Sequence, residues 1–381
     1  MSISASLEAE ITKYLGAEPY ERSENRKGYR NGYKGRSLKT RLGMLRLQVS
    51  QSRDGNFSPG LFQRYQRSEK ALRLTLMEMV RQGVTTRKVE RVTEVLCGIN
   101  FSASSVASLC QRLDEELEKF RTRPLESYYP YLLIDARYEK VRVGGQVVNQ
   151  AILIVVGVNE KGYREVLAVE IANLESESTW GELFKRLKER GLKKVNLVVS
   201  DNHEGLKNAL FRYFSGCLWQ RCKVHFIRNL SGLVSRREQK ELIKVLHRIR
   251  AKQSLKEAQS EIRWAANLYR GKYPEVARKI EEEMEETLTV LALPEEHQKK
   301  LATTNSLERV SQIIKSRTRL VRIFPNRESC LRLVTSLLQE IHEDWITGPR
   351  YLTIEKEDGL PEEEILEEGY LKEKEVCSIA T

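Results

Sequence analysis

Residues 129–143 read YPYLLIDARYEKVRV, residues 150–160 read QAILIVVGVNE, and residues 162–173 read GYREVLAVEIAN. The second run is almost continuously apolar, which is typical of a strand buried on both faces, and three strands in a row predict an antiparallel meander. Further elements are predicted along the chain as a helix over 178–191, a strand over 195–201, a helix over 203–214 and a strand over 216–222. The order βββ-α-β-α-β predicts a mixed α/β sheet.

Three carboxylates occupy notable positions in this pattern. Asp135 lies inside the first strand, Asp201 lies at the carboxyl end of the fourth, and Glu308 lies on a closing amphipathic helix that begins at Thr304 or Asn305. If the first strand lies beside the fourth, the acids converge. They would then supply the oxygen ligands that two Mg²⁺ ions, about 3.5–4 Å apart, require. Taken singly, each acid has an ordinary alternative: a solvent-facing edge residue, a helix cap, or half of a surface ion pair.

The sheet region is flanked by segments of different composition. Residues 37–53 alternate apolar and polar side chains across a Leu42-Gly43 turn, which predicts a small hairpin. We expect, in chain order, a basic N-terminal DNA-binding region with this hairpin (1–70), a helical, helix-turn-helix-like DNA-binding domain (71–125), the first part of a catalytic core (126–225), an all-helical insertion (226–300), the closing helix of the core with Glu308 (301–350), and an acidic C-terminal tail (351–381).

Charge indicates the kind of partner. The chain of 381 residues has a formal net charge of +12, and residues 355–375 hold ten acidic and three basic side chains, which leaves +19 for the remainder. Such a basic body favours a polyanion, because Lys and Arg release counterions from nucleic-acid phosphates. A basic protein without that role is the alternative. No run reaches the roughly 20 apolar residues of a membrane span and the start lacks a signal-peptide pattern, so we expect a cytoplasmic, nucleoid-associated protein.

Several segments in fixed order resemble one known family. They are ERSENRKGYRNGY (21–33), YPYLLIDARYEKVR (129–142), SDNHEGLKNAL (200–210), WQRCKVHFIRN (219–229) and TTNSLERVSQIIKSRTRLVRIFPN (303–326). These segments are similar to the successive signatures of the Mutator-type DDE transposases of bacterial insertion sequences, and the resemblance covers about residues 7–355. The chain departs from the family in a late start and in the acidic extension.

The resemblance implies a ribonuclease-H-like core interrupted by the helical insertion, with Asp135, Asp201 and Glu308 as the catalytic, metal-holding triad. It further implies two Mg²⁺ ions, for which Mn²⁺ substitutes. The partners implied are the terminal inverted repeats of the element and target DNA, bound by a homodimer or larger assembly. Water and then a DNA 3′-hydroxyl would act as nucleophiles.

Auxiliary positions follow from the same resemblance. Cys222 and His225 match a family Cys-x-x-His pair, and His203 matches a family position two residues after Asp201. A zinc site needs four ligands, so packing and hydrogen bonding is the favoured interpretation of the pair. We expect DNA contacts from a larger set of basic residues, for which a solvated basic face is the alternative. They are Arg26, Lys27, Arg30, Arg87, Lys88, Arg309, Lys315, Arg317, Arg319 and Arg322.

Two other functions fit the sequence. A transposase-derived regulator would bind DNA without cutting it, although a pure binder has no use for mutually repelling carboxylates. A ribonuclease-H-like nuclease would act on other nucleic acids, but the basic N-terminal region and the large insertion disfavour it.

Overall fold

The structure is a computed structural model that describes residues 3–40, 43–60, 70–82, 84, 86–97, 101 and 103–354. The chain forms two compact units, which divide between Glu116 and Leu117 inside helix α4 (Ala103–Thr122). None of the helices in the described residues is long and apolar enough to cross a membrane. The residues from 355 onward, which include most of the expected acidic tail, lie outside the described part.

The first unit begins with a helix packed on a hairpin. Helix α1 (Ile3–Leu15) precedes strands β1 (Arg30–Thr40) and β2 (Gly43–Ser52), which pair antiparallel. The hairpin lies where the alternation predicts one, with a longer first strand, and the expected turn residue Leu42 is outside the described residues. Leu7 of α1 is buried with Leu38 and Leu47 of the hairpin. Helix α1 was not predicted from the sequence, although its apolar residues recur at helical spacing.

Three helices complete the first unit. They are α2 (Lys70–Arg81), α3 (Thr86–Cys97) and α4, whose first part belongs to this unit. Leu76, Val89 and Val106 share one buried cluster. The sequence predicts that two of these helices stop at Gly83 and Gly98, because glycine is favoured just after a helix, and both glycines lie outside the described residues. A helix-turn-helix function for these helices stays a prediction.

The second unit is built on a mixed sheet, which confirms the α/β class. Within the described residues its strand order is β5-β4-β3-β6-β7. The strands are β3 (Tyr128–Val143), β4 (Gln146–Val158), β5 (Arg164–Ala172), β6 (Lys194–Ser200) and β7 (Leu218–Arg221). The first three form an antiparallel meander, and β3 lies parallel to β6. The first strand therefore lies beside the fourth, as convergence of the acids requires.

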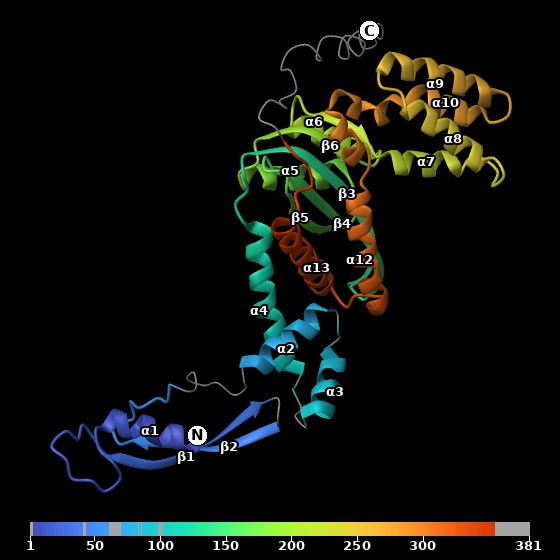
Figure 1. Ribbon diagram of the computed structural model, residues 1–381. Coiled ribbons are helices and arrows are strands. Elements are labelled where there is room, and N and C mark those ends of the chain that lie inside the picture. Colours follow the sequence, from blue (N-terminus) through green and yellow to red (C-terminus); the bar gives the residue numbers. More distant parts are fainter. Residues whose placement is uncertain are drawn as a thin grey trace. The chain divides into compact units, whose positions relative to one another are not determined.

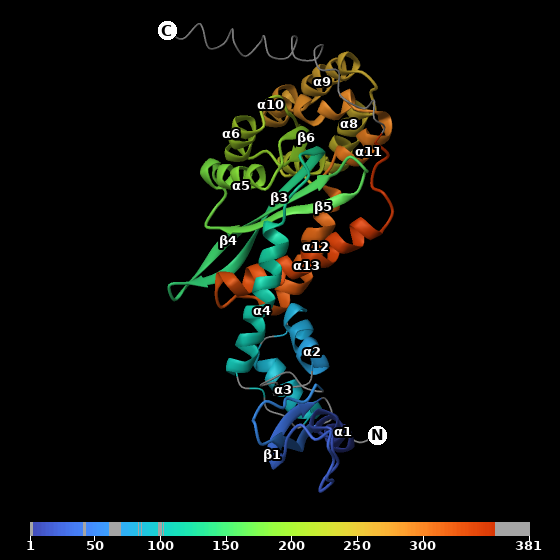
Figure 2. The same cartoon turned by 90° about the vertical axis from the view of Figure 1, so that its left-hand side faces the viewer.

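Helices cover both faces of this sheet (Figures 1 and 2). Helices α5 (Glu177–Glu189) and α6 (Glu204–Tyr213) cover one face, where Trp180 and Phe184 of α5 and Leu210 of α6 are buried. Helices α12 (Asn305–Val321) and α13 (Arg327–Thr347) bury their apolar sides against the other. Helix α13 was not predicted as a separate element. The two-faced cover explains the continuous apolar run of β4, since both sides of that strand are core.

All regular elements of the insertion, between residues 223 and 301, are helices. Its elements are α7 (Lys223–Ser231), α8 (Gln239–Arg250), α9 (Leu255–Arg270), α10 (Pro274–Glu283), the 3₁₀ turns η1 (Glu285–Thr287) and η2 (Thr289–Ala292), and α11 (Glu295–Leu301). Phe226, Leu246, Ile262 and Ile280 belong to a buried cluster separate from those of the sheet. Figure 1 shows α7 to α10 gathered as one group. The insertion thus has its own core.

A glycine allows α5 and α6 to meet closely beside Asp201. A Cβ added to Gly205 would lie 2.6 Å from the backbone nitrogen of Glu177 and 2.9 Å from the carbonyl carbon of Ser176. Because backbone atoms of a packed helix do not yield easily, Gly205→Ala is expected to lower the free energy of unfolding by about 1–3 kcal/mol. Urea denaturation measures this. Gly271→Ala is the matched control, since nothing lies within 4 Å of its added Cβ. Equal stability of the two variants would contradict the close approach.

Candidate active site

The site begins in the middle of the sheet. Asp135 lies on β3, where its partner on β4 is Ile154, and its Oδ2 accepts a hydrogen bond of 3.1 Å from the Ser311 hydroxyl of α12. Burial raises the pKa of the Asp135 carboxyl and the nearby Asp201 adds to the rise, while His225 and Ser311 act against it. An acid on a central strand is therefore kept in an environment that disfavours its charge.

The other two acids come from neighbouring elements. Asp201 directly follows β6, and its Oδ1 accepts a 2.8 Å hydrogen bond from the backbone N–H of Asn202. Glu308 lies in the first turn of α12, and its Oε1 accepts a 3.0 Å hydrogen bond from Arg228 of α7. Parallel pairing of β3 with β6 brings Asp201 next to the strand of Asp135. Packing of α12 on the same sheet brings Glu308 to the same part of the sheet as these two acids.

One imidazole lies between these carboxylates. His225 Nδ1 is 3.9 Å from Asp201 Oδ1, and His225 Nε2 is 3.8 Å from Glu308 Oε1. The pKa of His225 is raised to about 9, first by the neighbouring Cys222 and then by Asp201 and Asp135, against the lowering effect of burial. His225 is therefore a cation at neutral pH. Its Nδ1 is buried and has no hydrogen-bond partner among the residues that the structure describes.

The three acids are not arranged as a preformed metal site. No three His, Cys, Asp or Glu side chains of the described residues are grouped closely enough to hold a metal ion. Instead, the positive charge beside the carboxylates comes from His225 and Arg228. The donor set itself is chemically suited to a hard divalent ion, because all three candidate ligands are carboxylates and burial, with a smaller effect of Asp201, disfavours the charge of Asp135 when no cation balances it.

The predicted Cys222–His225 pair lies at the junction of two helix starts. Cys222 is the N-cap residue of α7, and its sulfur lies 3.1 Å from the hydroxyl of Thr304, the N-cap residue of α12. Burial acts to raise the pKa of Cys222, but His225 and Thr304 outweigh it and lower that pKa. The thiol thus links the helix of His225 to the helix of Glu308.

Two other histidines, His203 and His297, have different partners. His203 is the N-cap residue of α6, and its Nδ1 accepts from the backbone N–H of Leu206 at 3.3 Å. That contact gives His203 a capping role at the start of a helix. His297 is buried and lies 2.9 Å from the hydroxyl of Tyr131, so it belongs to the core. It does not join Cys222.

Sequence reasoning missed several residues that hold the acids in place. Arg137 of β3 donates to the backbone carbonyl of Ser311, and Glu139 of β3 accepts a 2.9 Å hydrogen bond from Thr318 of α12. These contacts fix α12 along β3. A helical signal was available for Ser311, because it lies three positions after Glu308 and therefore on a similar side of the helix.

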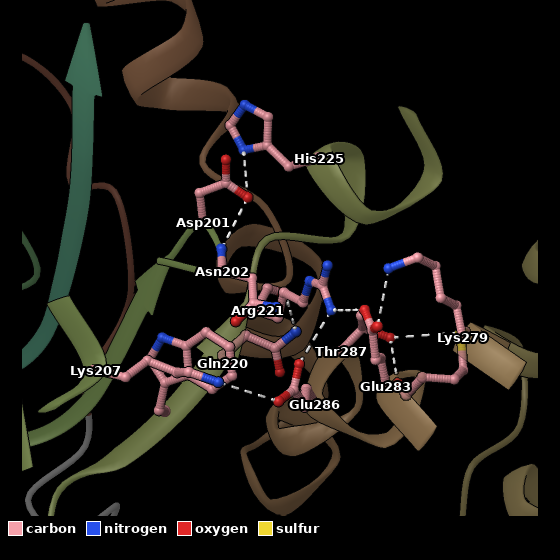
Figure 3. A network of polar contacts seen from close by, with 12 residues as sticks. Asp201, Asn202, Lys207, Gln220, Arg221, His225, Lys279, Glu283, Glu286 and Thr287 are labelled. Atoms are coloured by element: carbon pink, nitrogen blue, oxygen red, sulfur yellow. Dashed lines mark hydrogen bonds and ion pairs between the residues drawn. The ribbon is translucent and has the colours of Figure 1, made fainter. Parts of the chain in front are cut away.

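A buried arginine anchors the insertion to the sheet (Figure 3). Arg221, at the end of β7, has only 4% of its side chain exposed and contacts Glu283 at 2.5 Å and Glu286 at 3.1 Å. Lys279 reaches Glu283 at 3.1 Å, and Lys207 of α6 reaches Glu286 at 3.4 Å. Arg221 is four positions before His225, so the network fixes the segment that leads into the site.

The predicted DNA-contact residues differ in how they are engaged. Arg30 is held inside the first unit by Glu8 at 3.0 Å and by Thr12 at 2.7 Å. Arg26 donates to the backbone carbonyl of Glu21 at 2.9 Å. Lys27 and Lys88 are exposed, and the side chain of Arg87 lies outside the description. Five further cations on and after α12 are exposed and form no ion pair with any described residue: Arg309, Lys315, Arg317, Arg319 and Arg322.

The sequence is similar to known protein sequences over most of its length. A family described as "Transposase, Mutator family" matches residues 1–348. The transposase for insertion sequence element ISRM5 of Rhizobium meliloti is 48% identical over 349 residues, which are 92% of this chain and 88% of the relative. The transposase for IS406 of Burkholderia multivorans is 40% identical over 92% of this chain and 91% of the relative. That for IS256 in transposon Tn4001 of Staphylococcus aureus is 38% identical over 92% and 90%.

Among solved structures, similarity is weak. A Drosophila P element transposase strand transfer complex covers 77% of this chain and 83% of its own, at 9% identity and a TM-score of 0.32. A score this low does not establish a shared fold.

Proposed function

The chain belongs to the Mutator family of transposases, and from that premise we propose that it nicks and joins DNA by metal-dependent phosphoryl transfer with Asp135, Asp201 and Glu308 as the ligands. The family resemblance predicted from the sequence is confirmed by the match over residues 1–348. We further propose a ribonuclease-H-like catalytic core, with the terminal repeats of the element and target DNA as substrates. Pairing of two ends implies at least a homodimer.

The observation that carries the proposal is the convergence of distant acids on one imidazole. Asp201 and Glu308 face opposite nitrogens of His225, at 3.9 and 3.8 Å, although 107 positions separate them in the chain. Asp135 is close enough to both His225 and Asp201 for each to shift its pKa. Grouping like charges costs stability, so such a group is typical of a site that binds cations or does chemistry.

Two divalent ions would be held by the three carboxylates. When bound, they supply Lewis-acid stabilisation of the charge that develops on the attacking and leaving oxygens. The repulsion between Asp135 and Asp201 favours this loading, because a cation between them offsets it. Mg²⁺ suits an all-oxygen donor set, and Mn²⁺ is the expected substitute.

The protein's own side chains position these ligands. The Ser311 hydroxyl orients Asp135, the backbone N–H of Asn202 orients Asp201, and Arg228 orients Glu308. His225, protonated at neutral pH, is placed to neutralise part of the negative charge of the acids or of an incoming phosphate. Exposed cations of α12 then bind phosphates along the strand, since phosphate contacts hold register without reading bases.

A cleavage assay tests the proposal against its alternatives. The chain is incubated with labelled DNA that carries the inverted repeats flanking its own gene, with Mg²⁺, with Mn²⁺ and with chelator. We expect a nick that frees a 3′-hydroxyl at the repeat end, only with a divalent ion present. Binding without any nick would support the regulator, and preferential cutting of RNA–DNA hybrids would support the nuclease.

The backbone conformation of Arg322 allows its role in DNA binding to be separated from its effect on stability. Its backbone has φ 64°, a region that costs a non-glycine residue about 1–3 kcal/mol, and its side chain is exposed at the end of α12. Arg322→Gly is therefore expected to keep or raise stability by up to about 1 kcal/mol while weakening DNA binding. Arg319→Gly, in the last turn of the same helix, removes the same charge but should cost about 1 kcal/mol. Equal destabilisation of both variants in thermal melts would refute the strain argument.

A further inference from the structure

A second basic feature lies away from the acids, in an open pocket of about 460 Å³ at the junction of the insertion and the core. Lys223 at the start of α7 and Arg250 at the end of α8 line it, together with Lys252 and Lys299. Leu291 of the 3₁₀ turns contributes an apolar portion of the wall. None of these residues has been assigned to the catalytic site.

The charges of this pocket are only partly balanced. Lys252 contacts Glu261 at 3.2 Å, and Lys299 contacts Glu295, which also lines the pocket, at 2.9 Å. Lys223 and Arg250 form no ion pair with any described residue, although both are partly buried. Two neighbouring, partly buried cations that form no ion pair oppose folding unless an anion joins them.

Burial shifts the pKa of both side chains, and the positive charge of Arg250 also shifts that of Lys223. Burial and, after it, the nearby Arg250 lower the pKa of Lys223 to about 8, against an opposing effect of Cys222. Burial likewise lowers the pKa of Arg250. The positions of Lys223 and Arg250 in the pocket wall and the shifts in their pKa both indicate that positive charge is concentrated in this pocket.

We propose that this pocket binds a phosphate group of the DNA strand, through Lys223 and Arg250, at a point away from the scissile phosphate. Lys223 and His225 are two positions apart on α7, so their side chains point about 200° apart around the helix. The pocket therefore faces a different part of the DNA strand from the part that lies at Asp135, Asp201 and Glu308. Its role is to position DNA.

The shape of the pocket favours a phosphodiester over a free phosphate ion. The volume of about 460 Å³ lies in the range of sites that hold larger ligands, and one small ion would leave most of it empty. Leu291 offers an apolar surface for a sugar, while Lys223 and Arg250 offer donors for the anionic oxygens. A nucleic-acid backbone supplies both kinds of group in one chain.

The test uses the full chain and measures affinity for duplex DNA as a function of salt. Lys223→Gln combined with Arg250→Gln is expected to lower affinity about tenfold at low salt. The slope of log affinity against log salt should fall by about 0.9, the value for one lost phosphate contact. The nicking rate at saturating DNA should stay unchanged, because the pocket does not contact the reacting phosphate.

A matched control and a second probe keep the inference falsifiable. Arg278→Gln with Lys244→Gln removes the same charge from exposed positions that already pair with Glu282 and Glu241. If the pocket variant and this control show the same slope and affinity, the inference is overturned. It is also overturned if inorganic phosphate alone raises the melting temperature of the wild type, but not of the pocket variant, while the DNA slopes are equal.

The inference rests on DNA being the substrate, and its failure is separable from failure of that function. A wild type that neither binds nor nicks repeat DNA would remove the proposed function. A wild type that does both, beside a pocket variant with an unaltered salt slope, would remove only the pocket. Thermal melts confirm folding of the variant, which should be at least as stable as the wild type because it loses a repulsive pair.

Discussion

We expect Asp135→Asn to lower the single-turnover nicking rate by at least about a thousandfold while DNA binding is retained. The side chains are nearly equal in size, and the amide can still accept from Ser311. It cannot supply the negative charge that a divalent ion needs. Loss of several kcal/mol of transition-state stabilisation corresponds to this factor. Labelled repeat-end DNA in Mg²⁺, at saturating protein, measures the rate.

The same variant should be more stable than the wild type in metal-free buffer at neutral pH. The folded-state pKa of Asp135 is raised, chiefly by burial, so its ionised form opposes folding above the ordinary carboxyl range. Asparagine removes that cost. The gain should disappear as the pH falls below about 4, where the carboxyl is protonated in the folded and unfolded chains alike. Asp344→Asn, on the exposed side of α13, is the control for a lost charge elsewhere.

The nicking rate and the stability of the same variant distinguish a metal-ligand role of Asp135 from a structural role. An Asp135→Asn chain that nicks normally would exclude this carboxylate from the metal site. A chain that is both inactive and unfolded would give Asp135 a structural role instead. Asp201→Asn and Glu308→Gln are expected to repeat the loss of nicking, and their effects should not add to that of Asp135→Asn, because the ligands act as one unit.

The second large effect is expected at Arg221. Arg221→Met leaves Glu283 and Glu286 partly buried without their main counter-charge, and loss of one partner of a buried ion pair costs about 3–5 kcal/mol. The remaining contacts from Lys279 and Lys207 place the expected loss near the lower end. Guanidinium denaturation measures it, and the transition of the helical insertion should shift first. A loss under about 1 kcal/mol would contradict the anchoring role.

A companion variant separates charge from packing. Arg221→Met combined with Glu283→Gln and Glu286→Gln removes the stranded carboxylates, so much of the lost stability should return. The wild-type network should also weaken in acid. Burial favours a higher pKa for Glu283, but hydrogen bonds from Arg221 and Lys279 prevail and lower it. The stabilisation from Glu283 is therefore present above the unfolded carboxyl pKa and is lost as the pH falls through the lower folded value.

Much of the catalytic fold was predictable from strand and helix patterns. The apolar run of β4 and the strand that ends just before Asp201 have periodicities that do not depend on distant residues. The helix with Glu308 was expected at Thr304 or Asn305 and begins at Asn305. These elements are local, so local sequence specifies them. Helix α13 was missed, because the quoted family motifs end at residue 326 and the last predicted helix was the one that carries Glu308.

The surroundings of the acids were not predictable in the same way. Arg228 contacts Glu308 across 80 positions, and Arg221 contacts Glu286 across 65. Such pairs depend on how the insertion packs against the core, which periodicity does not report. Arg30 shows the same limit in the first unit, because its contact with Glu8 depends on α1 packing on the hairpin.

Anomalous diffraction tests the central claim most directly. Crystals of the chain with cleaved repeat-end DNA, grown in Mn²⁺, would give a map of the ions themselves. We predict two peaks about 3.5–4 Å apart, each about 2.0–2.2 Å from carboxylate oxygens of Asp135, Asp201 or Glu308. Peaks held by other side chains, or DNA in place at these acids with no peak beside them, would contradict the account.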